Sequence, residues 1–374
     1  MKNGFSLKGI RELMRKGKLD CIIANSHDNV YYSSDSDVST ITSLKRLATV
    51  LIPIDGESVF AVHANEEVTV KQSTWIKDIR VYEGGEWESL KPIKFVAEVL
   101  IEKGFSKGKI GVEMIDMPGL WIDYLRELLP SATFIDCQTI FDELRSIKSK
   151  DELKLLGEAN MATAKAITVA FEMARPGDTE REIAIDMMKL TLEYGADKIA
   201  SMTLGAGKNI LETHHIPNNY RIKKGDLLHT DFGAFFKGYR SDISRMAVVG
   251  KPNKKQLDAY DIVVRAEWAV TDVMDSGVTI LDVHNATREF YKGEGLDYRY
   301  PFIGHSMGIG CHENPFLGKV HGDWVLKPDM FFQIEPICTI GEMRMHTEDS
   351  FVTTKSKAKN VSEYRDISEL QVIK

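Results

Sequence analysis

The segment GDLLHTDFGAFFKGYRSDISRMAVVG, residues 225–250, decides how the second half of the chain folds. Two apolar runs flank a short turn, which we expect near Phe236–Lys237, so the segment reads as an antiparallel hairpin. In a hairpin centred there, Asp231 would lie directly opposite Asp242, with Cβ atoms about 4.5–5.5 Å apart. Two ionised carboxylates this close repel each other unless a cation lies between them. The alternative, two unrelated polar positions on an exposed face, predicts polar neighbours, whereas leucine and phenylalanine surround Asp231.

Further acids and histidines occur in apolar surroundings downstream. Glu335 lies in MFFQIEPI and Glu348 in RMHTEDSFVTT, and a buried carboxylate without a partner is costly. Arg344 is the only basic side chain nearby, and it cannot neutralise every acid. Histidines add to the pattern: IGHSMGIGCHENP carries His305 and His312 in a glycine-rich loop, and ETHHIPNN carries His214 and His215.

Four carboxylates with one or two imidazoles make an oxygen-rich site for a hard or borderline cation. Such a donor set suits Mn, Co, Fe or Zn better than Cu, and it argues against a structural zinc site built from thiolates. Carboxylates shared between two ions about 3.5–4 Å apart are typical of two-metal hydrolases, in which a bridging water ionises near pH 7. The sequence therefore predicts an oxygen-rich metal centre.

A competing signal is Gly304-His305-Ser306-Met307-Gly308, which matches the G-x-S-x-G nucleophile elbow of serine hydrolases. Asp329 and His346 would even complete the order Ser, Asp, His. Too few residues follow Ser306 for the rest of that fold, however, and no HGGG-type oxyanion segment precedes it. We therefore weigh the serine-hydrolase interpretation below the metal centre.

The pattern of expected elements changes near residue 147, where we place a domain boundary. Before it, strands alternate with helices, which indicates an α/β layer domain. After it come two capping boxes, Ser149 with Glu152 and Thr179 with Glu182, each of which starts a helix. The expected elements are helices at 5–16, 91–102, 119–129, 254–275 and 282–292, a hairpin around Asp55-Gly56, and strands at 19–24, 109–112 and 132–135.

Composition excludes several classes of protein. Apolar residues make up 43% of the 374 residues and charged residues 28%, so a globular protein is expected. With 48 basic and 55 acidic residues, the net charge of −7 disfavours binding to nucleic acid or to an anionic membrane. The four cysteines are scattered, and neither a signal peptide nor an apolar run long enough to span a bilayer is present, so we expect a cytoplasmic protein.

The order TDFGA, YRSDISR, GHSMGIGCHE, IEP and TED resembles the pita-bread metallohydrolases, a family that includes aminopeptidase P, prolidase and creatinase. The resemblance implies an α+β pita-bread catalytic domain at 147–374. It also implies a smaller α/β creatinase-type N-terminal domain at 1–146. The function implied is dinuclear metal-dependent hydrolysis of X-Pro bonds by a hydroxide that bridges the metals, as in an Xaa-Pro dipeptidase or aminopeptidase. A small peptide substrate and a homodimer are implied as well.

The resemblance also implies roles for individual residues. Asp231 would chelate one ion, His305 and Glu335 the other, and Asp242 and Glu348 would bridge them. Glu335 would also act as general base and acid, and the remaining expected catalytic residues, which would serve the oxyanion and the leaving nitrogen, are His214 and His312.

Three residues depart from the family pattern. His346 stands where an arginine is usual, Ile337 replaces a glycine after IEP, and Ser306 replaces a glycine after His305. We expect His346 and Arg344 to shape the surroundings of the metals and the substrate pocket. The departures leave an alternative open, a hydrolase or lyase of the same fold that acts on a guanidino, amide or zwitterionic small molecule.

Overall fold

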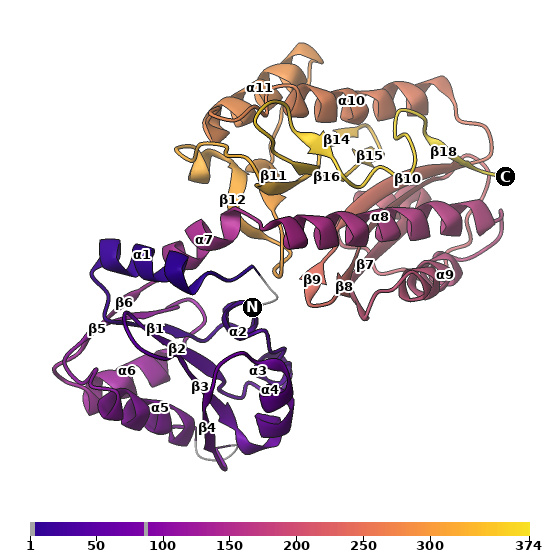
Figure 1. The fold of residues 1–374 in the computed structure, drawn as a ribbon. Helices are drawn as coiled ribbons and strands as arrows, with labels where there is room; N and C mark the ends of the chain where they lie inside the picture. Colours follow the sequence, from indigo (N-terminus) through magenta and orange to yellow (C-terminus); the bar gives the residue numbers. More distant parts are fainter. Residues whose placement is uncertain (1–3, 86–88) are drawn as a thin grey trace. The chain divides into compact units, whose positions relative to one another are not determined.

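The structure, a computed structural model, describes residues 4–85 and 89–374. The chain divides into two compact units, Met1–Arg145 and Ser146–Lys374 (Figure 1). Among the described residues, no helix is both long enough and apolar enough to cross a membrane.

The front unit is built on one mixed six-stranded sheet with the order β4-β3-β2-β1-β5-β6. The hairpin predicted around Asp55-Gly56 is confirmed, because β2 and β3 pair antiparallel with Thr49 opposite Ala61. β1 pairs parallel with β5, and β5 with β6, which requires helical crossovers. The strands are β1 (Cys21–Ala24), β2 (Thr49–Pro53), β3 (Val59–His63), β4 (Asp78–Tyr82), β5 (Lys109–Val112) and β6 (Thr133–Asp136).

Helices cover this sheet, and three of them match the predicted ones closely. α5 and α6 pack apolar side chains such as Leu100 and Leu125 against Ile23 and Ile110 of the sheet, which forms the core of the unit. The helices α2, α3, α4 and α7 were not predicted. The helices are α1 (Leu7–Gly17), α2 (His27–Ser34), α3 (Thr40–Ser43), α4 (Glu67–Ser73), α5 (Lys91–Glu102), α6 (Gly119–Leu128) and α7 (Gln138–Ser146), with a 3-10 turn η1 (Ala64–Glu66).

The first half of the back unit is a helix pair followed by a sheet. Both predicted capping boxes are present: Ser149 caps α8 together with Glu152, and Thr179 caps α9 together with Glu182. The sheet has the order β18-β10-β8-β7, and the short strand β9 pairs with the end of β8 next to the hairpin turn. The elements are α8 (Lys150–Met173), α9 (Glu180–Glu193), β7 (Lys198–Ala206), η2 (Gly207–Leu211), β8 (Leu227–Phe236), β9 (Tyr239–Arg240), β10 (Ile243–Val249) and β18 (Gln371–Ile373).

The second half repeats this plan with a second helix pair and a second sheet of order β12-β11-β13-β16-β17, beside which β14 and β15 form a hairpin. The predicted helix at 254–275 ends earlier, at Thr271. The elements are α10 (Lys254–Thr271), α11 (Ile280–Gly293), β11 (Phe302–Ser306), β12 (Glu313–Gly318), η3 (Lys319–His321), β13 (Phe331–Ile334), β14 (Ile337–Ile340), β15 (Met343–His346), β16 (Asp349–Val352) and β17 (Lys359–Asn360).

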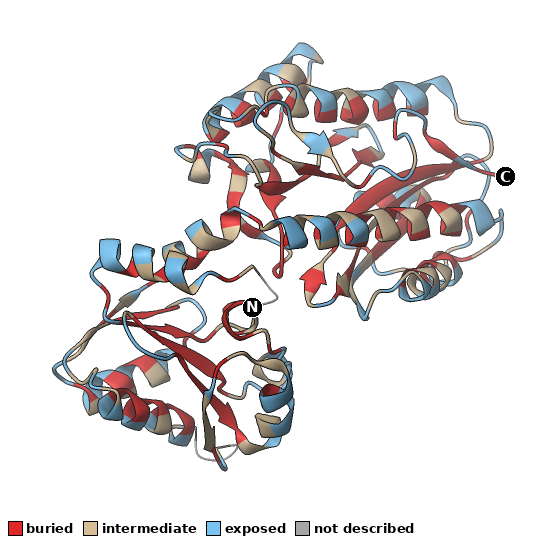
Figure 2. Ribbon diagram, viewed as in Figure 1, coloured by how far each residue is buried: buried red, intermediate tan, exposed pale blue. Residues whose placement is uncertain are grey.

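Within the back unit, the strands lie between α10 and α11 on one side and α8 and α9 on the other (Figure 1). Figure 2 shows these strands buried along most of their length, and all seven residues of β10 are buried. A strand covered on both faces has no solvated side, so any carboxylate it carries must find its partners inside the protein.

Gly304 marks the closest approach of two strands that carry predicted ligands. A Cβ at this position would overlap the carbonyl oxygen of Gln333 on the neighbouring strand β13. We expect Gly304→Ala to lower the free energy of unfolding by about 3 kcal/mol, because the two strands must separate. Urea unfolding followed by circular dichroism measures the change. Gly293→Ala is the control, since a Cβ there meets nothing within 4 Å; equal stability of both variants would contradict the prediction.

Candidate metal centre

The five predicted ligands lie on two sheets that meet inside the back unit. Asp231 lies within β8, and Asp242 lies between β9 and β10 of the same sheet. His305 belongs to β11, Glu335 directly follows β13 and Glu348 directly precedes β16, all in the second sheet. The Glu348 N–H donates to the Ser244 carbonyl at 3.1 Å, which joins the two sheets at this point.

The predicted hairpin register is wrong. Ser244, not Asp242, lies opposite Asp231. The turn is Lys237-Gly238, whose φ angles of 50° and 81° are both positive, as a tight two-residue hairpin requires. This correction shifts the partner of Asp231 by two residues, and side chains alternate along a strand with period two, so Asp242 keeps its face. Asp231 and Asp242 therefore remain neighbours, and each carboxyl group perturbs the pKa of the other.

The backbone of Asp242 is held by side chains from outside its own sheet. Its N–H donates to Asn160 Oδ1 on α8 at 2.9 Å. Its carbonyl accepts a hydrogen bond from the side-chain amide of Gln333 on β13. Because Asp242 is thus released from regular strand pairing, helix α8 and the second sheet set the direction of its carboxylate.

His305 directs a nitrogen lone pair at two of the glutamates. Its Nδ1 lies 3.1 Å from the Ser306 carbonyl oxygen, which can only accept, so Nδ1 carries the proton and Nε2 is unprotonated. Nε2 lies 3.8 Å from Glu335 Oε1 and 3.8 Å from Glu348 Oε1. Burial, and then the neighbouring His312, lower the pKa of His305 to about 3, so the ring is neutral at pH 7. One ligand atom each from Asp242, His305 and Glu348 lie within 4.8 Å of one another.

The carboxyl groups of this cluster are electrostatically strained. Burial raises the pKa of Asp242 to about 8, with the charge of Asp231 as the next cause. Burial and the neighbouring acids raise the pKa of Glu335 and of Glu348 well above the ordinary value, and burial also raises that of Asp231. Among the described residues, Glu335 Oε1 and Glu348 Oε1 are buried oxygens without a hydrogen-bond partner. Converging oxygens of this kind, with one imidazole lone pair, fit divalent cations.

The two histidines expected to act on substrate lie at the rim of the cluster. His312 is exposed, and its ring centroid lies 4.2 Å from that of His305. His214 is also exposed, and it lies close enough to Asp231 to lower the pKa of that carboxyl. Its neighbour His215 is buried, and both of its ring nitrogens form hydrogen bonds to carboxylates: Nε2 lies 2.9 Å from Glu180 and Nδ1 lies 2.8 Å from Glu212.

Arg344 and His346 are both buried on β15, next to the cluster. His346 Nε2 lies 3.8 Å from Glu335 Oε2, and Arg344 lowers the pKa that burial raises at Glu335. The structure thus brings both residues to the carboxylate that is expected to handle protons.

Sequence reasoning missed three residues at this site. His229 lies on β8, two residues before Asp231, and its Nε2 is 3.0 Å from His346 Nδ1. The Cys311 thiol lies 2.8 Å from Asp242 Oδ2, and the charge of Arg240 acts on both Asp242 and His312. The period of two along a buried strand could have revealed His229, because it places this residue on the face of Asp231.

The three residues of the serine-hydrolase alternative do not form a catalytic triad, because each bonds to a different partner. Ser306 is 1% exposed on a strand of an antiparallel sheet, and its Oγ accepts from Lys148 Nζ at 2.8 Å. Asp329 bonds to Lys150 Nζ at 2.6 Å, and His346 bonds to His229. The serine is therefore a buried hydrogen-bond partner and lacks the exposed hydroxyl of a strand-to-helix elbow.

We expect Ser306→Ala to retain metal-dependent activity, because the serine hydroxyl is buried and accepts a hydrogen bond from Lys148. The variant should lose about 1 kcal/mol of stability, the typical contribution of one hydrogen bond. Hydrolysis rates before and after chelation of metals, and labelling by a fluorophosphonate, measure the difference. An inactive Ser306→Ala variant with native stability, or labelling of Ser306, would contradict this prediction and support the serine-hydrolase mechanism.

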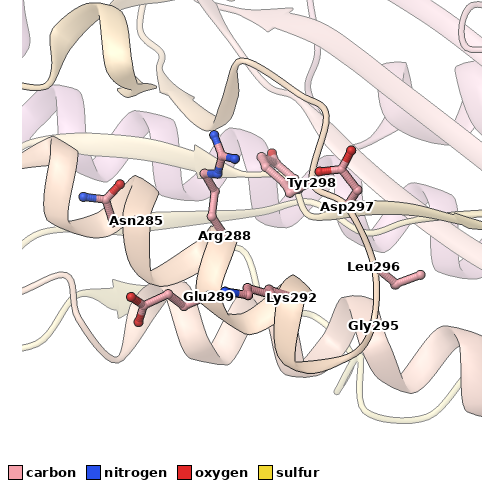
Figure 3. A pocket seen from close by; sticks show the side chains of 8 residues that line it. All are labelled: Asn285, Arg288, Glu289, Lys292, Gly295, Leu296, Asp297 and Tyr298. Carbon is pink, nitrogen blue, oxygen red and sulfur yellow. The ribbon is translucent and has the colours of Figure 1, made fainter.

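A hollow of about 660 Å³ lies elsewhere in the back unit. Figure 3 shows its lining along α11 and the loop that follows: Asn285, Arg288, Glu289, Lys292, Gly295, Leu296, Asp297 and Tyr298. None of these belongs to the carboxylate cluster. Side chains of both charge signs line it, so the hollow has no strong preference for a cation or an anion.

Comparison with protein-family models matches both parts of the chain. A model of metallopeptidase family M24 matches residues 154–355. A model of the creatinase/prolidase N-terminal domain matches residues 7–147.

Individual proteins and structures agree with these models. The chain is 30% identical to an Xaa-Pro dipeptidase of Pyrococcus horikoshii over 363 residues, which cover 95% of this chain and 96% of that protein. The crystal structure of a prolidase from Pyrococcus horikoshii OT3 has a TM-score of 0.82 at 26% identity and covers 96% of this chain and 99% of that one. An Xaa-Pro dipeptidase structure from Bacillus anthracis has a TM-score of 0.83 at 25% identity, with 98% of each chain covered. The predicted fold, an α+β catalytic domain preceded by a smaller α/β domain, is confirmed by these likenesses.

Proposed function

The chain belongs to metallopeptidase family M24 and carries a creatinase/prolidase N-terminal domain before its catalytic part, and from this we propose that it is an Xaa-Pro dipeptidase. The observation that carries the proposal is the buried cluster of Asp242, His305 and Glu348, with ligand atoms within 4.8 Å of one another. The unpaired oxygens of Glu335 and Glu348 and the lone pair of His305 Nε2 support a metal centre at this cluster.

We propose that two divalent ions bind here, with manganese, cobalt, zinc and iron as the candidates. Asp231 would hold one ion, His305 and Glu335 the other, and Asp242 and Glu348 would hold both. When bound, such ions supply a water that ionises near pH 7 and polarise the carbonyl group to be cleaved. The raised pKa values of the carboxyl groups support the proposal, because cations remove the cost of ionising them.

The chain's own residues would then move protons and stabilise charge. Glu335 would take a proton on its carboxylate and return it to the proline nitrogen that leaves, which is the work of a general base and acid. His312 lies at the rim, where partial desolvation of its ring and the charge of Arg240 lower its pKa, and the neutral ring that this favours has an N–H that can donate to the oxygen that gains charge. His214, exposed beside Asp231, would share this work.

A bond before proline suits this kind of site. The proline nitrogen carries no hydrogen and its φ is fixed, so proteases that bind substrate as an extended strand lose a hydrogen bond there. A small peptide held by direct contacts to side chains and metals does not need that hydrogen bond. The relatives that are named Xaa-Pro dipeptidase support this substrate class.

Metal analysis coupled to an assay of X-Pro dipeptides tests the proposal. We expect the chelated protein to be inactive, and reloading with manganese, cobalt or zinc to restore hydrolysis together with about two equivalents of bound metal per chain. Dipeptides without proline in the second position are the control. Absence of turnover of X-Pro dipeptides with every metal, while another small substrate is processed, would refute the dipeptidase and keep the metal site.

The alternative of a non-peptide substrate is not favoured, because the similar proteins are named as dipeptidases and prolidases.

We further propose that the protein forms a homodimer and works in the cytoplasm, with functional domains at 1–146 and 147–374. The four cysteines are free thiols in the structure, which supports a reducing compartment. Sedimentation of the purified protein and fractionation of cells test the dimer and the location.

A further inference from the structure

Three buried polar side chains that are not among the five proposed ligands form a connected series that ends at Glu335. Arg344 Nη1 lies 3.4 Å from His229 Nδ1, and His229 Nε2 lies 3.0 Å from His346 Nδ1. His346 Nε2 in turn faces Glu335 Oε2 at 3.8 Å. His229 and His346 are each 1% exposed and Arg344 is 3% exposed, so water does not compete for these contacts.

Arg344 fixes which atoms donate and which accept in this series of side chains. A guanidinium group can only donate, so His229 Nδ1 must accept from Arg344 and carries no proton. The proton of the His229 ring is therefore on Nε2, which donates to His346 Nδ1. His346 Nδ1 is then an acceptor too, and the single proton of its neutral ring is on Nε2, the nitrogen that faces Glu335.

Ser244 offers the competing arrangement. Its Oγ lies 3.3 Å from His346 Nδ1 and 3.4 Å from Glu348 Oε2. If His346 carried its proton on Nδ1, it could donate to Ser244, but His229 Nε2 would then have to be an acceptor. That would place the His229 proton on Nδ1, against the donor of Arg344. The shorter contact, 3.0 Å to His229, and the fixed donor at Arg344 favour the first arrangement.

We propose that His229 is a positioning residue, which fixes the Nε2-protonated tautomer of His346 so that His346 presents a neutral N–H donor to Glu335. The gap of 3.8 Å is longer than a hydrogen bond, and a shift of less than about 1 Å closes it. His346 stands where the family resemblance leads one to expect an arginine, so this chain replaces a charged donor by a neutral one.

The arrangement has two consequences for the centre. His346 Nε2 cannot bind a metal while it holds a proton, so His346 is a donor to Glu335 and not a sixth ligand. A neutral donor can orient the Glu335 carboxylate without adding a further charge beside it. The consequence for turnover rests on the proposed function, whereas the tautomer does not.

Nuclear magnetic resonance of protein labelled with nitrogen-15 in its histidine rings tests the tautomer directly. Long-range correlation of ring nitrogens and hydrogens distinguishes the two tautomers and the imidazolium, and signals are assigned by their loss in His229→Gln and His346→Gln. In metal-free and zinc-loaded protein alike, we expect His229 and His346 to be neutral and protonated on Nε2. A His346 ring protonated on Nδ1, doubly protonated, or bound to zinc through Nε2 would overturn the proposal.

Two substitutions of His229 separate positioning from mere packing. His229→Phe can neither accept from Arg344 nor donate to His346, and we expect kcat to fall about 10–100-fold with little change in KM. His229→Gln keeps an acceptor and a donor, and it should recover most of the lost kcat. The matched control is His284→Phe, a buried histidine of the same unit whose ring packs against Tyr298.

The outcomes remain distinguishable. Loss of activity in His229→Phe with an unchanged His346 tautomer would show that His229 only packs, and would overturn the proposal. Equal losses of kcat in the phenylalanine and glutamine variants would do the same. If the tautomers are as expected but X-Pro dipeptides are not cleaved, the proposed function fails and the positioning role stands.

Discussion

Replacing Glu348 by glutamine is expected to abolish metal-dependent activity and, at the same time, to stabilise the metal-free protein. Glu348 is 2% exposed, its Oε1 has no hydrogen-bond partner among the residues that the structure describes, and burial together with Asp242 raises its pKa. Glutamine has the same shape without the charge, so above pH 7 the metal-free variant should gain about 1–3 kcal/mol of stability. Because a ligand that would hold both ions is lost, activity should fall at least about 100-fold.

Thermal unfolding in the presence of a chelator and hydrolysis after metal loading measure the two effects. Glu313→Gln is the matched contrast, because the Glu313 carboxylate has partners: Lys148 Nζ at 3.4 Å and the Gly310 N–H at 2.9 Å. This second variant should lose stability with and without metal. If Glu348→Gln destabilises the metal-free protein as much as Glu313→Gln does, the cluster is not strained and the argument for a cation site is lost.

The carboxyl cluster is expected to destabilise the metal-free protein progressively as the pH rises from about 4 to about 8. Asp242 has a pKa of about 8 in the folded chain, and Glu335 and Glu348 are also raised far above their ordinary values. Between the unfolded pKa of about 4 and the folded pKa values, the folded state holds protons that the unfolded state has already released, so stability falls over this interval and the loss is complete once the pH has passed the folded pKa values. One such proton contributes about 1.4 kcal/mol for each unit of pKa shift.

The difference between metal-free and zinc-loaded protein isolates the site from other titrating groups. Histidines with lowered pKa values, such as His305, change their contribution only below about pH 7. His27, whose pKa its hydrogen bonds to Asp28 and Asp37 raise to about 9, lies outside the site, so its contribution cancels in this difference. We expect the gap between the two melting temperatures to widen with pH, and Glu348→Gln to reduce the slope for the metal-free protein. Calorimetry of zinc binding at pH 7 should show release of protons. A gap that is constant with pH would contradict the raised pKa values.

Local features were predictable where neighbouring residues decide the structure. The capping boxes at Ser149 and Thr179 start α8 and α9 as expected, because a cap needs only a side chain and a backbone three residues away. The hairpin at Asp55-Gly56 forms for the same reason. The register of the hairpin between β8 and β10 was wrong, because two adjacent two-residue turns were possible and only the positive φ of Lys237 and Gly238 decides between them.

The sequence by itself determined which chemistry is possible, because it places Asp231, Asp242, His305, Glu335 and Glu348 within or directly beside apolar strands that cannot solvate them. Which atoms meet was decided only by the tertiary structure. Three hydrogen bonds of the site join residues that are far apart in the chain: His229 to His346, Cys311 to Asp242, and Asp242 to Asn160. The physical reason is that hydrogen-bond direction and tautomer depend on distances of a few tenths of an ångström across two packed sheets, which no pattern of residue types along one strand specifies.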